Sequence, residues 1–96
     1  MDSEDILTTR RQQILRIAEA HGARNVRVFG SRARGDATAS SDVDLLIDLK
    51  PGRSLLDIVA IKQDLEELLG SDVDVVTEAS LSPYIRSEVL QSAVAL

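Results

Sequence analysis

The sequence predicts an α/β fold in which a small three-stranded mixed sheet is flanked by helices. Short stretches rich in valine, isoleucine and leucine alternate along the chain with segments whose apolar residues recur every three or four positions. Alternation of this kind is typical of layered α/β proteins. The length of 96 residues predicts one domain over residues 1–96, because a domain usually takes ~100–200 residues. We therefore expect one compact unit with at most one site.

The first third of the chain is expected to hold a helix, a strand and a short helical loop. Near-helical spacing of apolar residues predicts a first helix over about residues 5–21, and Gly22 ends it. Alternating β-branched and aromatic side chains predict a first strand at residues 26–29, ended by Gly30. The small, polar segment 31–41 is expected to form a loop with a short helix in it.

The middle of the chain contains the most regular helical pattern. A mostly apolar second strand is predicted at residues 44–49, and the turn at Lys50-Pro51-Gly52 ends it. Ser54 can then cap a long second helix, in which leucine and isoleucine recur at spacings of three and four until Gly70.

The last part predicts one more strand and one more helix. The third strand is expected at residues 72–77. Ser82 and Pro83 supply a cap and a first-turn proline for a final helix that includes Val94. The predicted order is therefore helix, strand, short helix, strand, helix, strand, helix.

The composition excludes several functional classes. Sixteen acidic and eleven basic residues give a net charge of −5 at pH 7, and only Phe29 and Tyr84 could stack on bases, so we expect no general nucleic-acid binding. The chain has no cysteine and one histidine, His21, so any metal ion must be held by oxygen ligands. The acidic start and the lack of an apolar run longer than four residues predict neither a signal peptide nor a membrane span, and hence a cytoplasmic protein.

Positive charge gathers around the end of the first predicted strand. Within eleven residues, four arginines bracket Gly30-Ser31: Arg24, Arg27, Arg32 and Arg34. At a strand-to-helix turn, glycine lets backbone N–H groups approach a phosphate, and the serine hydroxyl adds a donor. A Gly-Ser pair by itself is more often only a turn with a helix cap, so its meaning depends on what lies beside it.

Carboxylates form the second half of the expected site. Asp42 and Asp44 begin the second predicted strand two residues apart, so both side chains face one side of the sheet with Cα atoms about 7 Å apart. Asp74 lies near the start of the third strand between Val73 and Val75. Hard oxygen ligands placed in this way can share magnesium ions.

The two halves of the site meet only if the strands pair in a particular way. For Gly30-Ser31 to reach Asp44, the first and second strands must run antiparallel, and parallel pairing of the second and third strands would bring Asp74 to Asp44. Asp48 shares this face but lies about 13 Å beyond Asp44, so we exclude it. Asp72 stays open as an alternative third carboxylate, although we favour Asp74.

Three carboxylates beside a phosphate cradle are the parts needed for two-metal phosphoryl or nucleotidyl transfer. In such a reaction the metal ions clamp the triphosphate and stabilise the attacking and leaving oxygens, and Asp74 would serve as base or as a ligand on the nucleophile side. A Walker-type phosphate loop is excluded, because residues 30–36 contain no lysine followed by serine or threonine.

The chain resembles the DNA polymerase beta-like nucleotidyltransferase superfamily in one spaced signature: Gly30-Ser31, ten further residues, Asp42-Val43-Asp44, and then Val73-Asp74-Val75. The string Gly-Ser-Arg-Ala-Arg-Gly-Asp looks specifically like the minimal nucleotidyltransferases. The likeness covers residues 26–77 by motif and the whole chain by element order. It implies the polymerase beta-like nucleotidyltransferase fold.

The resemblance also implies a role for each matching residue. Gly30 and Ser31 would hold the nucleotide triphosphate, and Arg34 would neighbour its phosphates. The three carboxylates would bind magnesium, with two ions expected, and Asp74 would help to activate the acceptor hydroxyl.

Minimal nucleotidyltransferases are similar to antitoxins of two-gene systems whose partner is a HEPN-domain protein, often an RNase toxin. The resemblance implies transfer of AMP from ATP to a partner tyrosine, so we expect a protein adenylyltransferase that acts as an antitoxin in a homo- or hetero-oligomer. The alternative is an inactive module of the same fold that neutralises its partner through an apolar surface around Tyr84, Ile85 and Val89, although Tyr84 is expected to lie half packed on the sheet. A small-molecule nucleotidyltransferase fits the motif but would need a second domain to enclose its acceptor.

Overall fold

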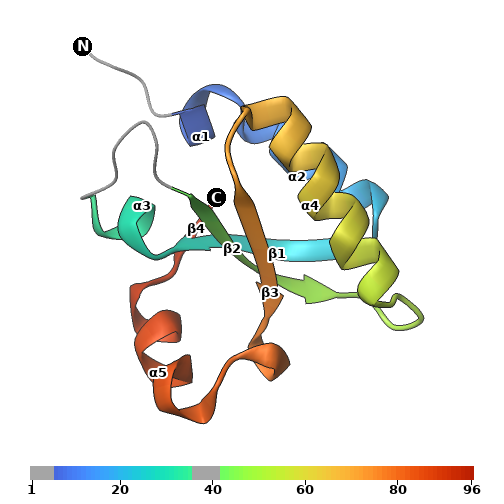
Figure 1. The fold of residues 1–96 in the computed structure, drawn as a ribbon. Helices are drawn as coiled ribbons and strands as arrows, with labels where there is room; N and C mark the ends of the chain where they lie inside the picture. Colours follow the sequence, from blue (N-terminus) through green and yellow to red (C-terminus); the bar gives the residue numbers. More distant parts are fainter. Residues whose placement is uncertain (1–5, 36–41) are drawn as a thin grey trace.

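Four strands form one mixed sheet in the computed structural model, which describes residues 6–35 and 42–96 (Figure 1). The strand order is β3-β2-β1-β4. As predicted, β1 (Ala23–Phe29) pairs antiparallel with β2 (Val43–Leu49), and β2 pairs parallel with β3 (Val73–Thr77). The prediction of a three-stranded sheet is wrong, because β4 (Val94–Ala95) adds an antiparallel strand on the other side of β1.

The fourth strand replaces the end of the predicted last helix. That helix, α5 (Pro83–Ser92), starts at Ser82 and Pro83 as predicted but ends before Val94. Ala93 is extended (φ −67°, ψ 138°), and beyond it the Leu96 backbone N–H donates to Val26 O at 3.0 Å. Pairing with β1 satisfies backbone groups that would otherwise stay open along the sheet edge.

The predicted first helix is interrupted. It consists of α1 (Ile6–Thr9) and α2 (Arg11–Ala20), and Arg10 between them has φ −103° and ψ 12°. Helical hydrogen bonds still cross the break, since Arg10 N donates to Ile6 O and Ile14 N donates to Arg10 O, each at 2.9 Å. The break follows two consecutive β-branched threonines, a residue type of reduced helix propensity. Asp5, the predicted first residue of this helix, lies outside the described residues.

The first strand begins earlier than the apolar alternation predicts. It runs from Ala23, and its pairing register with β2 shifts between Arg24 and Arg27. Asn25 lies in this irregular stretch with φ 53°, a left-handed conformation that asparagine tolerates better than most residues. The shift breaks the period-two pattern, which is why the sequence indicated only the regular part of the strand.

The long second helix is confirmed at both ends. It is α4 (Leu55–Leu69), with Ser54 as its N-cap and left-handed Gly70 after its last turn. Ser54 Oγ accepts from Leu56 N at 3.2 Å, and Asp57 Oδ2 accepts from Ser54 N at 3.0 Å, which together form a capping box. The helix buries Ile61, Leu65 and Leu69. None of the helices within residues 6–35 and 42–96 is both long and apolar enough to cross a membrane.

The sheet has an apolar layer on each face. Residues of α1, α2 and α4 pack with Val43, Leu45 and Ile47 in the larger cluster, and Figure 1 shows α2 and α4 side by side, away from α5. Leu46 lies in a second, smaller cluster with residues of α5 and the segment that precedes it. Because side chains alternate along a strand, Asp44 shares the second face with Leu46. The candidate site therefore lies on the face opposite α2 and α4.

Candidate active site

The turn after β1 places backbone directly against a carboxylate. Gly30 has φ 76° and ψ −151°, and the short helix α3 (Ser31–Arg34) begins immediately after it, as the sequence predicted. Ala33 N and Arg34 N both donate to Gly30 O at 3.1 Å, which closes this single helical turn. A Cβ atom at Gly30 would collide with Asp44 Oδ2. Only glycine fits here, and the Gly-Ser turn and the carboxylate lie side by side.

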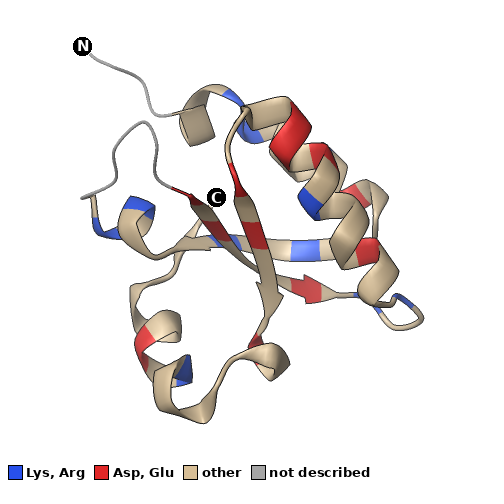
Figure 2. Cartoon of the chain, in the orientation of Figure 1, with Lys and Arg blue, Asp and Glu red and all other residues tan. Residues whose placement is uncertain are grey.

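The strand register brings the predicted carboxylates together. Asp44 is paired with Phe29 of β1 on one side and with Asp74 of β3 on the other. Asp42 precedes β2 and is exposed, as is Asp74, whereas Asp44 is half-buried. Figure 2 shows acidic residues at neighbouring ends of β2 and β3, with basic residues on α3 beside them. Both predicted pairings, antiparallel to β1 and parallel to β3, are confirmed.

The three carboxylates repel one another. Burial, followed by the negative charges of Asp74 and Asp42, raises the pKa of the Asp44 carboxyl above its ordinary value of 3.8, while the positive charge of Arg34 acts in the opposite direction. Arg34 is therefore close enough to the cluster to influence it. The carboxylates concentrate negative charge, which favours binding of a cation, and Arg34 lies at the margin of the site.

The carboxylates suit magnesium in donor type and in charge. Mg²⁺ prefers oxygen ligands and is often held by one or two carboxylates together with substrate phosphates. In the part of the chain that the structure describes, no three histidine, cysteine, aspartate or glutamate side chains are already arranged as a set of metal ligands. Asp42 and Asp74 are exposed, so burial does not prevent their side chains from turning toward an ion beside Asp44.

The geometry separates Asp74 from two other aspartates. Asp48, which the sequence argument excluded, lies toward the far end of β2 and accepts from Arg27 Nη2 at 3.1 Å and from Asn25 Nδ2 at 3.0 Å. Asp72 comes before β3, where its backbone carbonyl accepts from Val43 N at 2.9 Å. Asp74 is the residue in register with Asp44 and the one whose charge acts on it most among its neighbours, which favours Asp74 as the third carboxylate.

Two charged residues that contact the start of β3 were not indicated by the sequence. Lys62 Nζ donates to Val73 O at 2.7 Å, and Glu66 Oε2 accepts from Val73 N at 3.1 Å. Both belong to α4, and both contact the residue that precedes Asp74. Their spacing of four residues on a helix signals only a surface ion pair, so nothing in the sequence pointed to the strand.

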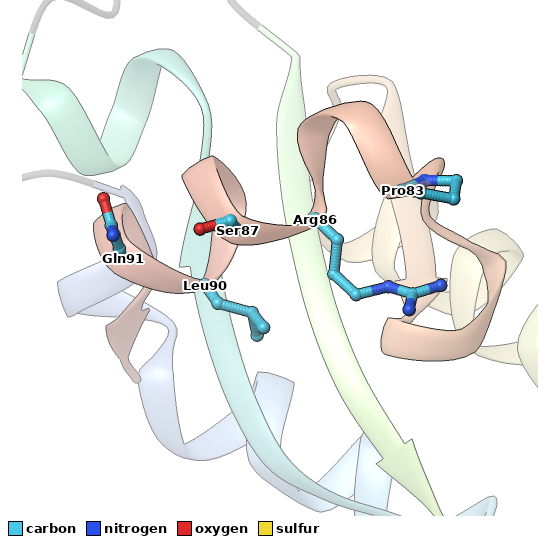
Figure 3. Close-up of a pocket in the computed structure, with 5 residues that line it drawn as sticks. All are labelled: Pro83, Arg86, Ser87, Leu90 and Gln91. Atoms are coloured by element: carbon cyan, nitrogen blue, oxygen red, sulfur yellow. The ribbon is translucent and has the colours of Figure 1, made fainter.

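A separate hollow lies on α5. It has a volume of about 420 Å³, and Figure 3 shows the residues that line it: Pro83, Arg86, Ser87, Leu90 and Gln91. None of the predicted site residues is among them. Tyr84 beside it is 95% exposed and Ile85 46%, whereas Val89 is buried. The expectation that Tyr84 is half packed on the sheet is therefore wrong, and Val89 cannot belong to an exposed apolar surface.

Comparisons with known proteins agree with the fold. The profile of a family described as nucleotidyltransferase domain matches residues 10–96. Protein adenylyltransferase MntA of Thermococcus cleftensis is 41% identical over 91 residues, which cover 95% of this chain and 89% of that protein. A solved structure named as a candidate minimal nucleotidyltransferase is 49% identical, with a TM-score of 0.83 over 94% of this chain and 92% of the other.

A more distant structure shares the fold. It is described as a toxin-antitoxin with AMP-PNP, is 22% identical, and aligns with a TM-score of 0.74 over 88% of this chain and 69% of the other. At that identity the likeness is one of fold alone. The family match over residues 10–96 includes β1, β2 and β3.

Proposed function

Because this chain belongs to the nucleotidyltransferase domain family, we propose that it is a protein adenylyltransferase, which transfers AMP from ATP to a hydroxyl group of a partner protein. The observation that carries the proposal is the register of Asp44 with Asp74 beside the Gly30 turn. The relative at 41% identity is named a protein adenylyltransferase, which supports a protein as the acceptor.

The triphosphate would bind at the turn after β1. Ser31 begins α3, and the backbone N–H groups of Ala33 and Arg34 donate back to Gly30 O. The backbone N–H of Ser31, at the start of this turn, would donate to a phosphate oxygen. The Ser31 hydroxyl adds a donor, and Arg34 supplies positive charge beside the carboxylates. These groups suit the phosphates of ATP better than any uncharged ligand.

The carboxylates would hold magnesium. Asp42 and Asp44 would be its main ligands and Asp74 a further one, with two ions as the expected number. When bound, the metal neutralises phosphate charge and polarises the reacting phosphoryl group. The negative charges of Asp74 and Asp42 act against ionisation of Asp44, and a bound cation would relieve this repulsion.

The chain's own contribution to the chemical step is to move one proton and to fix geometry. The Asp74 carboxylate would accept the proton of the acceptor hydroxyl, whose oxygen forms a bond to the α-phosphorus of ATP. The bond from that phosphorus to the bridging oxygen of the β-phosphate breaks, and pyrophosphate leaves. Gly30 and Ser31 would keep the triphosphate in line for this displacement.

The partner would be the toxin of a toxin-antitoxin pair. The fold is shared with a structure described as a toxin-antitoxin with AMP-PNP, and the resemblance drawn from the sequence implies a HEPN-domain toxin modified on a tyrosine. The net charge of −5 disfavours a nucleic-acid acceptor. We place the reaction in the cytoplasm, in a hetero-oligomer of the chain with its partner.

The second candidate is an inactive module that neutralises the partner by binding alone. The observation that favours it is the exposure of Tyr84 and Ile85 beside the hollow on α5, since tyrosine and isoleucine at this exposure suit a protein contact. The acidic cluster plays no part in this function.

The intact mass of the partner protein separates the two candidates. The partner is the protein encoded next to this gene, incubated with this chain, ATP and Mg²⁺, and then without Mg²⁺. An AMP adduct that disappears without Mg²⁺ and with Asp44→Asn, but persists with Asp48→Asn, supports the adenylyltransferase. Asp48 is the matched control because it lies on the same strand and face, away from the cluster. A stable complex with no adduct supports the binding module.

A further inference from the structure

Two side chains of α4 form hydrogen bonds with the backbone of one residue of β3, Val73. Lys62 Nζ donates to Val73 O at 2.7 Å, Glu66 Oε2 accepts from Val73 N at 3.1 Å, and Lys62 Nζ also donates to Glu66 Oε2 at 2.8 Å. The backbone donor and acceptor of one residue are thus both bound by a helix that packs beside the strand.

These hydrogen bonds lie at the open edge of the sheet. β3 is the outermost strand, next to β2. The neighbouring residue Asp72 directs its carbonyl toward β2, where it accepts from Val43 N. Backbone groups of successive residues point to opposite edges of a strand, so the N–H and C=O of Val73 point away from β2. Lys62 and Glu66 take the place that water or another strand would otherwise fill.

Asp74 directly follows Val73, and it lies where the negative charge of Asp44 repels it. It is paired in register with Asp44, and both Asp74 and Asp42 act on Asp44 as like charges. Repulsion of this kind favours movement of the β3 edge away from β2. We propose that Lys62 and Glu66 form a positioning clamp that holds the start of β3 so that Asp74 stays opposite Asp44. The proposal rests on the proposed function for its catalytic consequence, but not for the clamp itself.

The positive charge of Lys62 also interacts with the nearby carboxylates. The hydrogen bond to Glu66 raises the pKa of Lys62, and the negative charges of Asp74 and Asp72 raise it further, while burial acts against them. The ammonium group therefore lies within electrostatic reach of the carboxylates while it is bound to Val73 O.

Loss of the clamp is expected to change the position of Asp74 without unfolding the protein. The Lys62 side chain is 44% exposed and that of Glu66 30%, so solvent screens the ion pair and its contribution to the stability of the fold is small. A displacement of about 1 Å at a reacting group can cost about 100-fold in rate. Loss of the clamp is therefore expected to reduce catalysis in a protein that remains folded.

The test compares Lys62→Met with Lys62→Arg, Glu66→Ala and a matched control, Arg53→Met. Arg53 forms another i,i+4 ion pair, with Asp57 at 3.3 Å, and it lies at the opposite end of α4 from the strand contact. The measurements are kcat and KM for ATP in AMP transfer, the urea midpoint, and amide hydrogen exchange at Val73 and Asp74.

We expect Lys62→Met and Glu66→Ala to lower kcat at least about 10-fold with KM for ATP within about 2-fold, since Gly30 and Ser31 are untouched. Lys62→Arg should restore most of kcat, and exchange at Val73 and Asp74 should accelerate about 10-fold or more in the first two variants alone. Arg53→Met should match the unaltered chain in all of these. A kcat loss that follows the urea midpoint, or equal loss in Arg53→Met, would overturn the proposal.

The outcome also separates the clamp from the proposed function. If the unaltered chain transfers no AMP to its partner, the proposed function fails and hydrogen exchange alone decides the clamp. Unchanged exchange at Val73 and Asp74 in Lys62→Met refutes the clamp whatever the activity of the protein.

Discussion

Replacement of Gly30 by alanine tests the contact between the Gly-Ser turn and the acidic cluster. Its φ of 76° and ψ of −151° belong to a region that only glycine occupies without strain, and a residue with a Cβ held there costs about 1–3 kcal/mol. The new Cβ would also collide with Asp44 Oδ2 and lie 3.3 Å from Asp44 Cγ. Rotation of the Asp44 side chain out of its preferred rotamer costs about 0.5–1.5 kcal/mol more.

We therefore expect Gly30→Ala to lower the free energy of unfolding by about 1.5–4.5 kcal/mol. A domain of this size has about 5–15 kcal/mol of stability, so the variant should still fold. Gly52→Ala is the matched control, because Gly52 also has a positive φ of 88° but no atom lies within 4 Å of its added Cβ. It should lose only the backbone contribution, about 1–2 kcal/mol.

Urea unfolding followed by circular dichroism measures the stability of both variants, and AMP incorporation into the partner measures activity. Transfer should fall about 100-fold or more in Gly30→Ala, since Asp44 is displaced from its position, and should stay within about threefold of the unaltered chain in Gly52→Ala. Equal rates in the two variants would refute the reasoning, because the collision with Asp44 would then have no consequence for the reaction.

Three further predictions concern charge, capping and packing. The double variant Asp42→Asn with Asp44→Asn should abolish transfer, while its urea midpoint stays the same or rises because like charges are removed from one face; a lower midpoint with residual transfer would contradict this. The hydrogen bond from the Ser54 N–H lowers the pKa of Asp57 in the folded protein below the ordinary value of 3.8. The Asp57 carboxylate therefore stabilises the fold at a pH above 3.8, and this stabilisation is lost as the pH falls through the pKa of the folded state. Asp57→Asn should therefore be less stable at pH 7, and the gap in thermal midpoint should close in acid; a gap that is constant with pH would exclude this account. Leu65 is 0% exposed, and Leu65→Ala should cost about 2–5 kcal/mol in urea unfolding; a loss below about 1 kcal/mol would mean that the core around it collapses to fill the space.

Much of the framework could be predicted from local signals. The bounds of α4 follow from Ser54, Gly70 and the apolar spacing between them, because caps and helical periodicity act over one or two turns. The pairing of Asp44 with Asp74 followed from the long helix between two short strands, since such a connection joins parallel strands. Because side chains alternate along a strand, the sequence also predicted that Asp44 lies on one face of the sheet and Leu45 on the other.

What only the tertiary structure decided concerns the edges and surfaces of the sheet. The sequence around Val94 is compatible with a helix or a strand, and it forms β4 because β1 has open backbone groups beside it. Lys62 and Glu66 have the spacing of an ordinary ion pair, and their contact with Val73 exists only because α4 packs along the edge of β3. The sequence by itself determined the elements whose start and stop signals lie within a few residues of one another. Interactions between residues distant in sequence depend on which backbone groups and side chains are left exposed once the sheet has formed, and local patterns carry no record of that.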